Sequence, residues 1–386
     1  MRAWTRLCAV FGFLYALLLN SQAASAQPRV NDFEVKLFGR YWHVASYFVQ
    51  DDLQQNANED TFLEPEGLAF ENGVLYVSGD RESDEAYGRL ARYTLGSSGT
   101  LSFVSFLQMP STSPNWWGPE GLAFNRSGVG YGSAANSMVS VERDTGQAGI
   151  IDLVTGSVTN RVSVGNAEDV TFLPGLEQFA VLQDLGTSVS VVYRDVGMTA
   201  TGQQFATAPG TNGLVRLSAS FGSWFTRTSQ ATEVLLAVTK ANPGNGILVY
   251  DLAGTQIDVQ YNLPTMPRAR IPLGGQFYML LPAFGTVETV TVDEAGKVIF
   301  IGDESNTMIH VLTLGPPAAD FDRDGDVDRS DLDQFEACGS GPAISASTGC
   351  EGADFDSDGD VDQIDFAMFQ RCISGENVAA DAECLE

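Results

Sequence analysis

Two stretches near the C-terminus carry carboxylates at the spacing of a calcium-binding loop. They run from Asp320 to Asp331 and from Asp354 to Asp365. Each has aspartate at loop positions 1, 3, 5, 9 and 12 and glycine at 6, and its position 7 would turn a backbone carbonyl inward. Ca²⁺ takes about six to eight oxygen ligands, which a tight loop supplies from alternate residues. The predicted ligands, for two ions, are Asp320, Asp322, Asp324, Asp326, Asp328, Asp331, Asp354, Asp356, Asp358, Asp360, Asp362 and Asp365.

An acidic, solvated linker is the alternative interpretation of these stretches. It is disfavoured because both copies keep the glycine at position 6, the valine at position 8 and every carboxylate in register. Val327 and Val361 are expected to pair the two loops through a short β contact. The position-12 aspartates should open helices, where negative charge suits the helix dipole. Apolar residues then follow at helical spacing, so the two helices should pack into one compact module.

This stretch resembles the type I dockerin, a duplicated calcium loop–helix module that docks cellulosomal enzymes onto cohesins. The resemblance covers residues 318–386, and each copy has the dockerin Asp at position 12 where an ordinary EF-hand has Glu. It implies calcium binding and docking onto a cohesin-like or other cell-surface protein. The chain departs from the family at Arg329-Ser330 and Gln363-Ile364, where dockerins help to choose the partner, and in carrying four cysteines.

The four cysteines of this module form two equivalent pairs. Cys338 and Cys350 are twelve residues apart, as are Cys372 and Cys384. Four cysteines allow about three pairings, and the spacing favours disulfides within each pair. A zinc site is the competing interpretation, but the short CxxC spacing is missing.

The N-terminus has the pattern of a secretory signal peptide. Arg2 and Arg6 supply positive charge, an apolar run extends from Leu7 to Leu19, and Ala24-Ser25-Ala26 is a small-residue cleavage site. The run is too short for a membrane anchor. Residues 1–26 are therefore predicted to be removed, which leaves a secreted or cell-surface protein without membrane insertion. The net charge of −28 disfavours nucleic acid as a partner.

Residues 31–315 consist of short apolar runs between turns, which predicts an all-β fold. The motif Glu64–Phe70 returns at Gly118–Phe124 and, more faintly, at 167–172 and 287–292. Units of fifty-odd residues, each a small meander, are typical of a β-propeller. Five blades are visible, with room for a sixth between Gly254 and Ala283, and the strands from Phe33 to Val49 are expected to complete the last blade. A β-sandwich is the alternative, but it does not predict the returning motif.

The first strand of each blade should line the central channel. Glu66, Glu120, Glu168 and Glu288, joined by Asp169, would then form an acidic collar that could hold a metal ion, a cationic ligand or a general base. The alternative is that they cap strand starts by accepting backbone N–H bonds from neighbouring blades. The turn carboxylates Asp80, Asp184 and Asp303 are expected to be turn-formers.

The repeated motif resembles secreted propellers described as phytase-like or esterase-like. Phytase-type members of that group bind phosphate through clustered Lys and Arg around calcium, whereas the mature body has only Lys36, Lys240 and Lys297. Phytase activity is therefore not assigned. His43 and His310 are expected to pack rather than catalyse, and Trp116-Trp117 could stack on a sugar ring.

These features predict a secreted calcium-binding protein in which a dockerin-like module attaches a propeller to an extracellular protein partner. A glycan or small ligand could lie at the propeller mouth. The alternative is a secreted hydrolase, with a polysaccharide- or ester-active propeller that the module targets. A third option is that calcium is purely structural and the module docks onto its own propeller. The sequence identifies no catalytic residues.

Overall fold

The computed structural model describes residues 25–26, 29–38, 40–49, 64–80, 89–96, 99–109, 119–143, 145–186, 188–222, 233–240, 245–261, 263, 269–273, 276–280, 284–305, 307–315, 317, 319–322, 326–350, 352–356, 358–376, 378, 380–381 and 384–385. The chain divides into two compact units. One comprises residues 1–31 and 45–311, and the other residues 32–44 and 312–386. Most of the predicted signal peptide, residues 1–26, lies outside the described residues.

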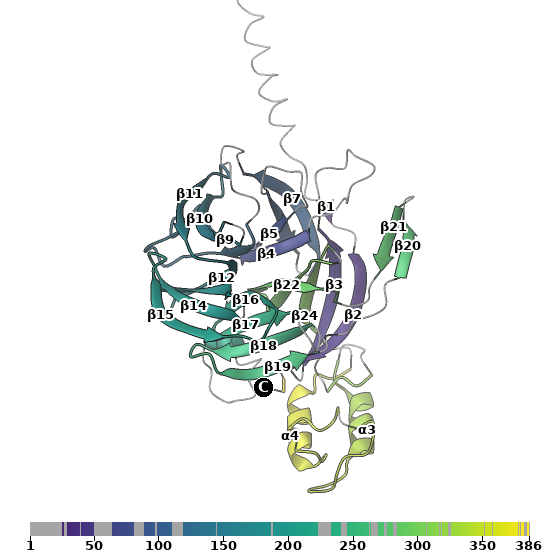
Figure 1. Cartoon of the computed structure of the whole chain (residues 1–386). Coiled ribbons are helices and arrows are strands. Elements are labelled where there is room, and N and C mark those ends of the chain that lie inside the picture. Colours follow the sequence, from purple (N-terminus) through teal and green to yellow (C-terminus); the bar gives the residue numbers. More distant parts are fainter. Residues whose placement is uncertain are drawn as a thin grey trace, which may run out of the picture. The chain divides into compact units, whose positions relative to one another are not determined.

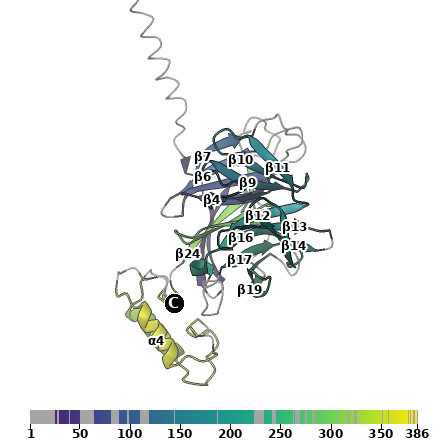
Figure 2. The same ribbon diagram turned by 90° about the vertical axis from the view of Figure 1, so that its left-hand side faces the viewer.

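The larger unit is a five-bladed β-propeller (Figures 1 and 2). Each blade has one innermost strand, which contacts the innermost strands of the two neighbouring blades, so the five close into a ring. The innermost strands are β4 (Glu64–Glu71), β8 (Gly121–Ala123), β12 (Ala167–Leu173), β16 (Thr211–Leu217) and β22 (Val287–Asp293).

The blades are antiparallel meanders that run outward from these strands in sequence order. The further strands are β5 (Val74–Asp80), β6 (Arg89–Leu95) and β7 (Leu101–Gln108); β9 (Ser137–Glu142), β10 (Gln147–Asp152) and β11 (Val158–Ser163); β13 (Gln178–Asp184), β14 (Val189–Asp195) and β15 (Ala200–Ala206); β17 (Val234–Thr239), β18 (Gly246–Asp251) and β19 (Gln256–Tyr261); and β23 (Val298–Asp303) and β24 (Met308–Leu314). The short helix α2 (Ala219–Gly222) follows β16.

The N-terminal strands complete the last blade, as the sequence predicts. The order of that sheet is β2-β3-β24-β23-β22, with β2 at Arg29–Leu37 and β3 at Arg40–Phe48. The backbone N–H of Val49 also donates to the carbonyl of Thr307 at 3.0 Å. The ring is therefore closed by a sheet that joins the two ends of the propeller sequence. Strand β1 (Ser25–Ala26) pairs with β7 at the outer edge of the first blade.

Among the described residues, the sixth blade for which the sequence left room is not formed. Residues 254–283 contain β19, which is the outer strand of the fourth blade, and a two-stranded hairpin of β20 (Ala269–Leu273) and β21 (Gln276–Leu280). The repeat spacing stretches here because a hairpin is inserted between the fourth and fifth blades.

Apolar side chains from adjacent blades pack between the sheets. One cluster joins Leu182 and Tyr193 of the third blade to Leu235 and Leu248 of the fourth, and all four are buried. Strand alternation supplies this pattern, because residues two apart lie on the same face of a sheet. The hydrophobic core therefore lies between the blades, and the innermost strands line the channel.

The smaller unit contains helices α3 (Arg329–Cys338) and α4 (Gln363–Cys372). Both begin with a capping box, in which the N-cap and N3 side chains each accept a backbone N–H from the other residue. The rings of Phe335 and Phe369 stack with centroids 5.2 Å apart, so the predicted packing of the helices is confirmed. In the part of the chain that the structure describes, no helix is both long and apolar enough to cross a bilayer.

Candidate functional site

The described carboxylates of each predicted calcium loop form two groups that share position 12, one with positions 1 and 3 and one with positions 7 and 9. In the first loop one oxygen from each of Asp320, Asp322 and Asp331 lies within 4.8 Å of the others. The second loop repeats this group with the residues thirty-four positions further on, which are Asp354, Asp356 and Asp365. In both loops this group combines positions 1, 3 and 12, which are ligand positions in calcium loops of this type.

The position-12 side chains are held by backbone donors in the same way in both loops. Asp331 accepts the N–H of Phe321 at 2.6 Å and that of Asp328 at 2.9 Å. Asp365 accepts the N–H of Phe355 at 2.6 Å and that of Asp362 at 2.8 Å. The backbone thus fixes the carboxylate that closes each loop, and it does so twice with nearly equal distances.

Position 1 of the second loop holds the turn at position 6. The Oδ2 atom of Asp354 accepts the N–H of Gly359 at 2.9 Å, and Gly359 has a φ of 95°. A side chain would be strained at that φ, so glycine is required at position 6. In the first loop Asp324 and Gly325 lie outside the described residues.

Positions 7 and 9 have different roles from one another. The position-9 aspartates, Asp328 and Asp362, are the N-caps of α3 and α4 and accept the N–H two residues on, at 2.7 Å in both cases. At position 7 the side chains of Asp326 and Asp360 are buried, and Asp360 accepts the N–H of Ala343 at 2.5 Å. This contact anchors the position-7 side chain to the segment after α3.

The β contact expected between Val327 and Val361 is not formed. The carbonyl of Val361 accepts the N–H groups of Ser340 and Gly341 at 3.0 and 3.1 Å, and the carbonyl of Val327 accepts the equivalent pair after α4 at the same distances. The N–H of each valine donates to a serine Oγ at 2.9 Å. Both valines therefore bond to the segment that follows the helix of the other repeat, which leaves no backbone group for pairing with each other.

Both predicted disulfides are present. Cys338 is bonded to Cys350 and Cys372 to Cys384, with Cα atoms 5.3 and 4.8 Å apart. Each closes the segment that follows one helix and makes the contacts to the other loop. Disulfides of this kind form in oxidising environments outside the cytosol.

At the propeller, a β-bulge sets the channel-facing residue of four innermost strands. The register with the second strand shifts at Glu66, Glu168, Asn212 and Glu288, so each of these residues is left out of the pairing. In the second blade Glu120 directly precedes β8, and its N–H donates to the carbonyl of Val141 at 2.9 Å. The predicted collar positions are therefore equivalent in all five blades, and the fourth has asparagine.

Sequence reasoning missed Asn212 and Lys240. The Nδ2 atom of Asn212 donates to Glu288 Oε1 at 2.7 Å, and Lys240 Nζ lies 3.0 and 2.8 Å from the two Glu288 oxygens. The signal for Asn212 is that Asn-Gly-Leu at 212–214 matches the Glu-Gly-Leu of the repeated motif. Lys240 follows the second strand of its blade, as Arg143 does in the second blade, and each pairs with the collar glutamate of the next blade.

Burial is the main cause of the pKa shifts of the glutamates at the mouth of the channel. Burial raises the pKa of Glu288 to about 7, although Lys240 opposes the shift. Burial also raises the pKa of Glu168, against the charge of Arg143, whose Nη1 lies 3.3 Å from Glu168 Oε2. For Lys240 burial alone would lower the pKa, but neighbouring carboxylates, Glu288 first, outweigh it and raise the pKa.

Asp169 does not belong to the collar. It is buried, and its two oxygens accept the N–H groups of Val170 and of Leu214 in the fourth blade, both at 2.7 Å. Burial raises its pKa well above the ordinary range, against these bonds and one from the backbone of Leu122 in the second blade. Asp169 thus joins three innermost strands, which is the role that the alternative interpretation gave to the glutamates.

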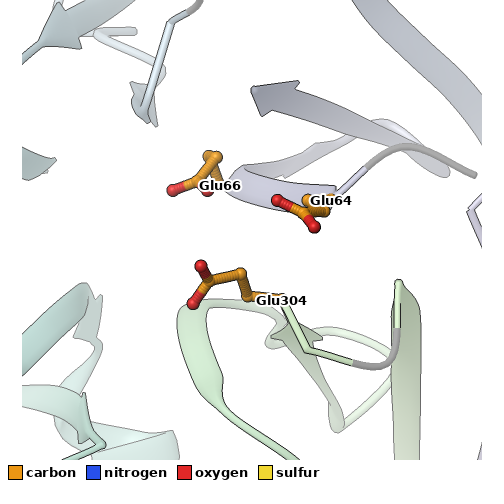
Figure 3. A group of neighbouring side chains, drawn as sticks. All are labelled: Glu64, Glu66 and Glu304. Atoms are coloured by element: carbon orange, nitrogen blue, oxygen red, sulfur yellow. The ribbon is translucent and has the colours of Figure 1, made fainter. Parts of the chain in front are cut away.

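A further acidic group, outside the calcium loops, lies at the mouth of the first and fifth blades. One oxygen from each of Glu64, Glu66 and Glu304 lies within 4.8 Å of the others, and Figure 3 shows the side chains of Glu66 and Glu304 facing each other. The ammonium of Lys240 lies 3.6 Å from Glu304. Such a group can hold a cation, and Lys240 supplies part of the positive charge.

The remaining candidates are structural or lie outside the described part of the chain. Asp184 accepts the N–H of Gly186 at 2.7 Å, as a turn-former does. His310 bonds to Ser46 at 2.8 Å and to Asp303 at 3.0 Å, which is the order of a catalytic triad, but all three residues are fully buried. Trp116-Trp117 and the side chain of Asp80 are not described.

No family model matches the chain, and no curated protein matches its sequence. Among solved structures it is similar to the gluconolactonase XC5397 from Xanthomonas campestris, with 15% identity over 76% of this chain and 97% of that one and a TM-score of 0.41. It is also similar to hydrazine synthase from Kuenenia stuttgartiensis, with 11% identity over 68% and 80% and a TM-score of 0.39. A third similar structure is an auxiliary nutrient binding protein from Bacteroides ovatus, with 13% identity over 75% and 70% and a TM-score of 0.37.

Proposed function

We propose that this chain is an exported calcium-binding protein whose C-terminal module, residues 318–386, takes two Ca²⁺ ions and attaches the propeller to an extracellular protein. The observation that carries the proposal is the repetition of one ligand geometry. Positions 1, 3 and 12 converge in both loops, and in both the same backbone donors hold position 12. A solvated acidic linker would have no reason to repeat these bonds.

Charge explains why the module should need the ions. From Ala318 onward the chain has fourteen Asp and five Glu against three Arg. Carboxylates held within a few ångströms of one another repel, and each disfavours ionisation of the next. A divalent cation at each loop offsets that repulsion, so calcium binding should be coupled to ordering of the module.

The surface that fits the docking role lies at the first turns of the helices. The residues after position 9, where dockerins help to choose the partner, are Arg329-Ser330 and Gln363-Ile364, and all four are exposed. The exposed fraction of Ile364 is 55%. An exposed aliphatic residue beside polar ones suits a protein partner, and a cohesin-like domain is the partner that the dockerin resemblance implies.

Calorimetry on the full-length protein tests the calcium step. Titration of the chelator-treated protein with Ca²⁺ should show two ions bound, and circular dichroism should show helical signal that EDTA removes. Uptake of fewer than two ions would reject the proposal. Sedimentation with a purified cohesin domain tests the docking step, where a complex should form with calcium and dissociate with EDTA. Full calcium uptake without a complex would reject the cohesin-type partner alone.

The hydrolase alternative needs a nucleophile or base that a substrate can reach. The Ser46–His310–Asp303 relay is fully buried, and Glu288 is only 5% exposed. A panel of phosphoester, ester and glycan substrates addresses this alternative directly. Turnover that disappears in Glu66→Gln or Glu120→Gln would favour the hydrolase.

A further inference from the structure

A cavity of about 460 Å³ lies at the end of the channel where the innermost strands finish. The predicted collar residues lie at the opposite end of the channel, where the same strands begin. We call that end the acidic mouth. The cavity is lined by consecutive residues from all five innermost strands, and we call it the cup. Its volume falls in the range of small-molecule sites, about 300–1,000 Å³.

Neighbouring innermost strands are in close contact at two glycines. A Cβ atom added at Gly67 would lie 1.7 Å from the carbonyl oxygen of Glu120, and one added at Gly213 would lie 2.7 Å from Thr289 Cα. The backbones of neighbouring innermost strands therefore touch at this level, and only glycine permits it. This close packing of adjacent strands lies at a level between the acidic mouth and the cup.

The repeated motif of the sequence builds the wall of the cup. Its last residue is phenylalanine in three consecutive blades, which are Phe70, Phe124 and Phe172, and all three line the cavity. The residue before it is small or β-branched in every blade, and includes Ala69 and Ala123, which are 4% and 5% exposed. The phenylalanines give one side of the lining an apolar surface.

The other side of the cup carries Arg216 and Glu294. The Nε and Nη2 atoms of Arg216 donate to Glu233, whereas its Nη1 lies 3.6 Å from Glu294 Oε1. That distance is too long for a direct hydrogen bond. A ligand hydroxyl beside this pair could accept from Nη1 and donate to the Glu294 carboxylate, whose Oε1 also accepts the N–H of Ser218 at 2.6 Å. A hydroxyl that bonds to both Arg and a carboxylate makes two strong hydrogen bonds, because each partner is charged.

The charge balance of the cup excludes a strongly anionic ligand. Arg126, the second guanidinium of the lining, is paired with Glu71 at 2.5 Å and covers the ring of Phe124 at 4.5 Å. Arg216 is paired with Glu233, and Glu294 adds a further negative charge. Both cations are thus already neutralised, so the site offers no net positive field.

We propose that the cup binds a neutral sugar of one or two rings. A pyranose has an apolar C–H face that can lie against Phe70, since Arg126 covers Phe124 and Phe172 is 6% exposed, and ring hydroxyls that can bridge Arg216 and Glu294. The proposal concerns only the propeller and does not depend on calcium binding by the C-terminal module.

Saturation-transfer NMR on the full-length protein with four probes tests this site. Glucose and cellobiose are neutral sugars, glucuronate is an anionic sugar, and indole is a flat apolar molecule without hydroxyls. The two neutral sugars should bind, and glucuronate should bind more weakly. Ala123→Phe fills the cup and should weaken neutral-sugar binding at least tenfold. Val154→Ala, at a residue 71% exposed, is the matched control and should leave it unchanged.

Three results would overturn the proposal. These are sugar binding that Ala123→Phe leaves unchanged, binding of indole without either neutral sugar, and binding of none of the four probes to the folded wild type. Circular dichroism checks that each variant is folded. If Ala123→Phe fails that check, Ala69→Leu fills less of the same space from the first blade, and undiminished sugar binding in that variant would count equally against the site.

Discussion

The Oγ atom of Ser46 lies 2.8 Å from Nδ1 of His310, and the two residues are 264 positions apart in the sequence. His310 in turn lies 3.0 Å from Asp303 Oδ2, which also accepts the N–H of Gly285 at 2.5 Å. Ser46 belongs to β3, whereas His310 and Asp303 belong to β24 and β23. This buried relay links the N-terminal strand to the last blade and so holds the ring closed.

Ser46→Ala should destabilise the propeller by about 1–3 kcal/mol, because it leaves a buried ring nitrogen of His310 without its partner. Urea unfolding followed by fluorescence measures the change. Ser163→Ala, at an exposed position of β11, is the control and should change stability little. Equal stability of the two variants would show that the relay does not hold the ring.

Asp365→Asn should remove one of two calcium sites. The amide keeps the size of the side chain but loses the charge, and it cannot accept bonds through both terminal atoms as Asp365 does from Phe355 and Asp362. Calorimetry should show one ion bound in place of two. Asp333→Asn makes the same charge change at a side chain 59% exposed on α3 and should keep two. Two ions bound by Asp365→Asn would contradict the ligand assignment.

Glu288→Gln should flatten the pH dependence of propeller stability between about pH 4.5 and 7. The folded pKa of Glu288 is raised to about 7 from an ordinary 4.5. A raised pKa means that the folded state prefers the protonated carboxyl, so its contribution is present below pH 4.5 and is lost as the pH rises through 7. The loss is on the order of 2 kcal/mol. If the stabilities of the wild type and the variant changed with pH in the same way across this range, the assignment would be ruled out.

Gly213→Ala should destabilise the propeller by about 1–3 kcal/mol, as overpacking usually does. The new methyl would lie 2.7 Å from Thr289 Cα and 2.8 Å from the carbonyl oxygen of Glu288, so two innermost strands would have to separate. Gly96→Ala is a suitable control, because the nearest atom there is Thr100 O at 3.5 Å. Thermal unfolding of the two variants compares them, and equal midpoints would show that the strands can separate freely.

The repeated pattern of the sequence predicted the blades well, because it marks the position where four of the five innermost strands bulge and then meet their neighbours. It located Glu66 and Glu288 at equivalent places for the same reason. Side chains outside the repeat were not predictable in this way. Lys240 reaches Glu288 from the end of a second strand, and only the folded ring brings them together.

The calcium loops show the same division between local and non-local information. The grouping of positions 1, 3 and 12 follows from spacing within a dozen residues. Each helix was expected to open at position 12, but the N-caps are the position-9 aspartates Asp328 and Asp362. The partner of Val327 was predicted wrongly, because the choice between Val361 and the segment after α4 depends on how two repeats are placed. The Ser46–His310 bond, across most of the propeller sequence, had no local signal at all.

The exchange of backbone bonds at Val327 and Val361 has a consequence for how the C-terminal module can be divided. Each loop is completed by residues from beyond the helix of the other repeat, at Ser340-Gly341 and Ser374-Gly375. A chain severed between the repeats would therefore not yield two independent half-modules, since each fragment would keep its carboxylates and lose the strand-like edge that supports them.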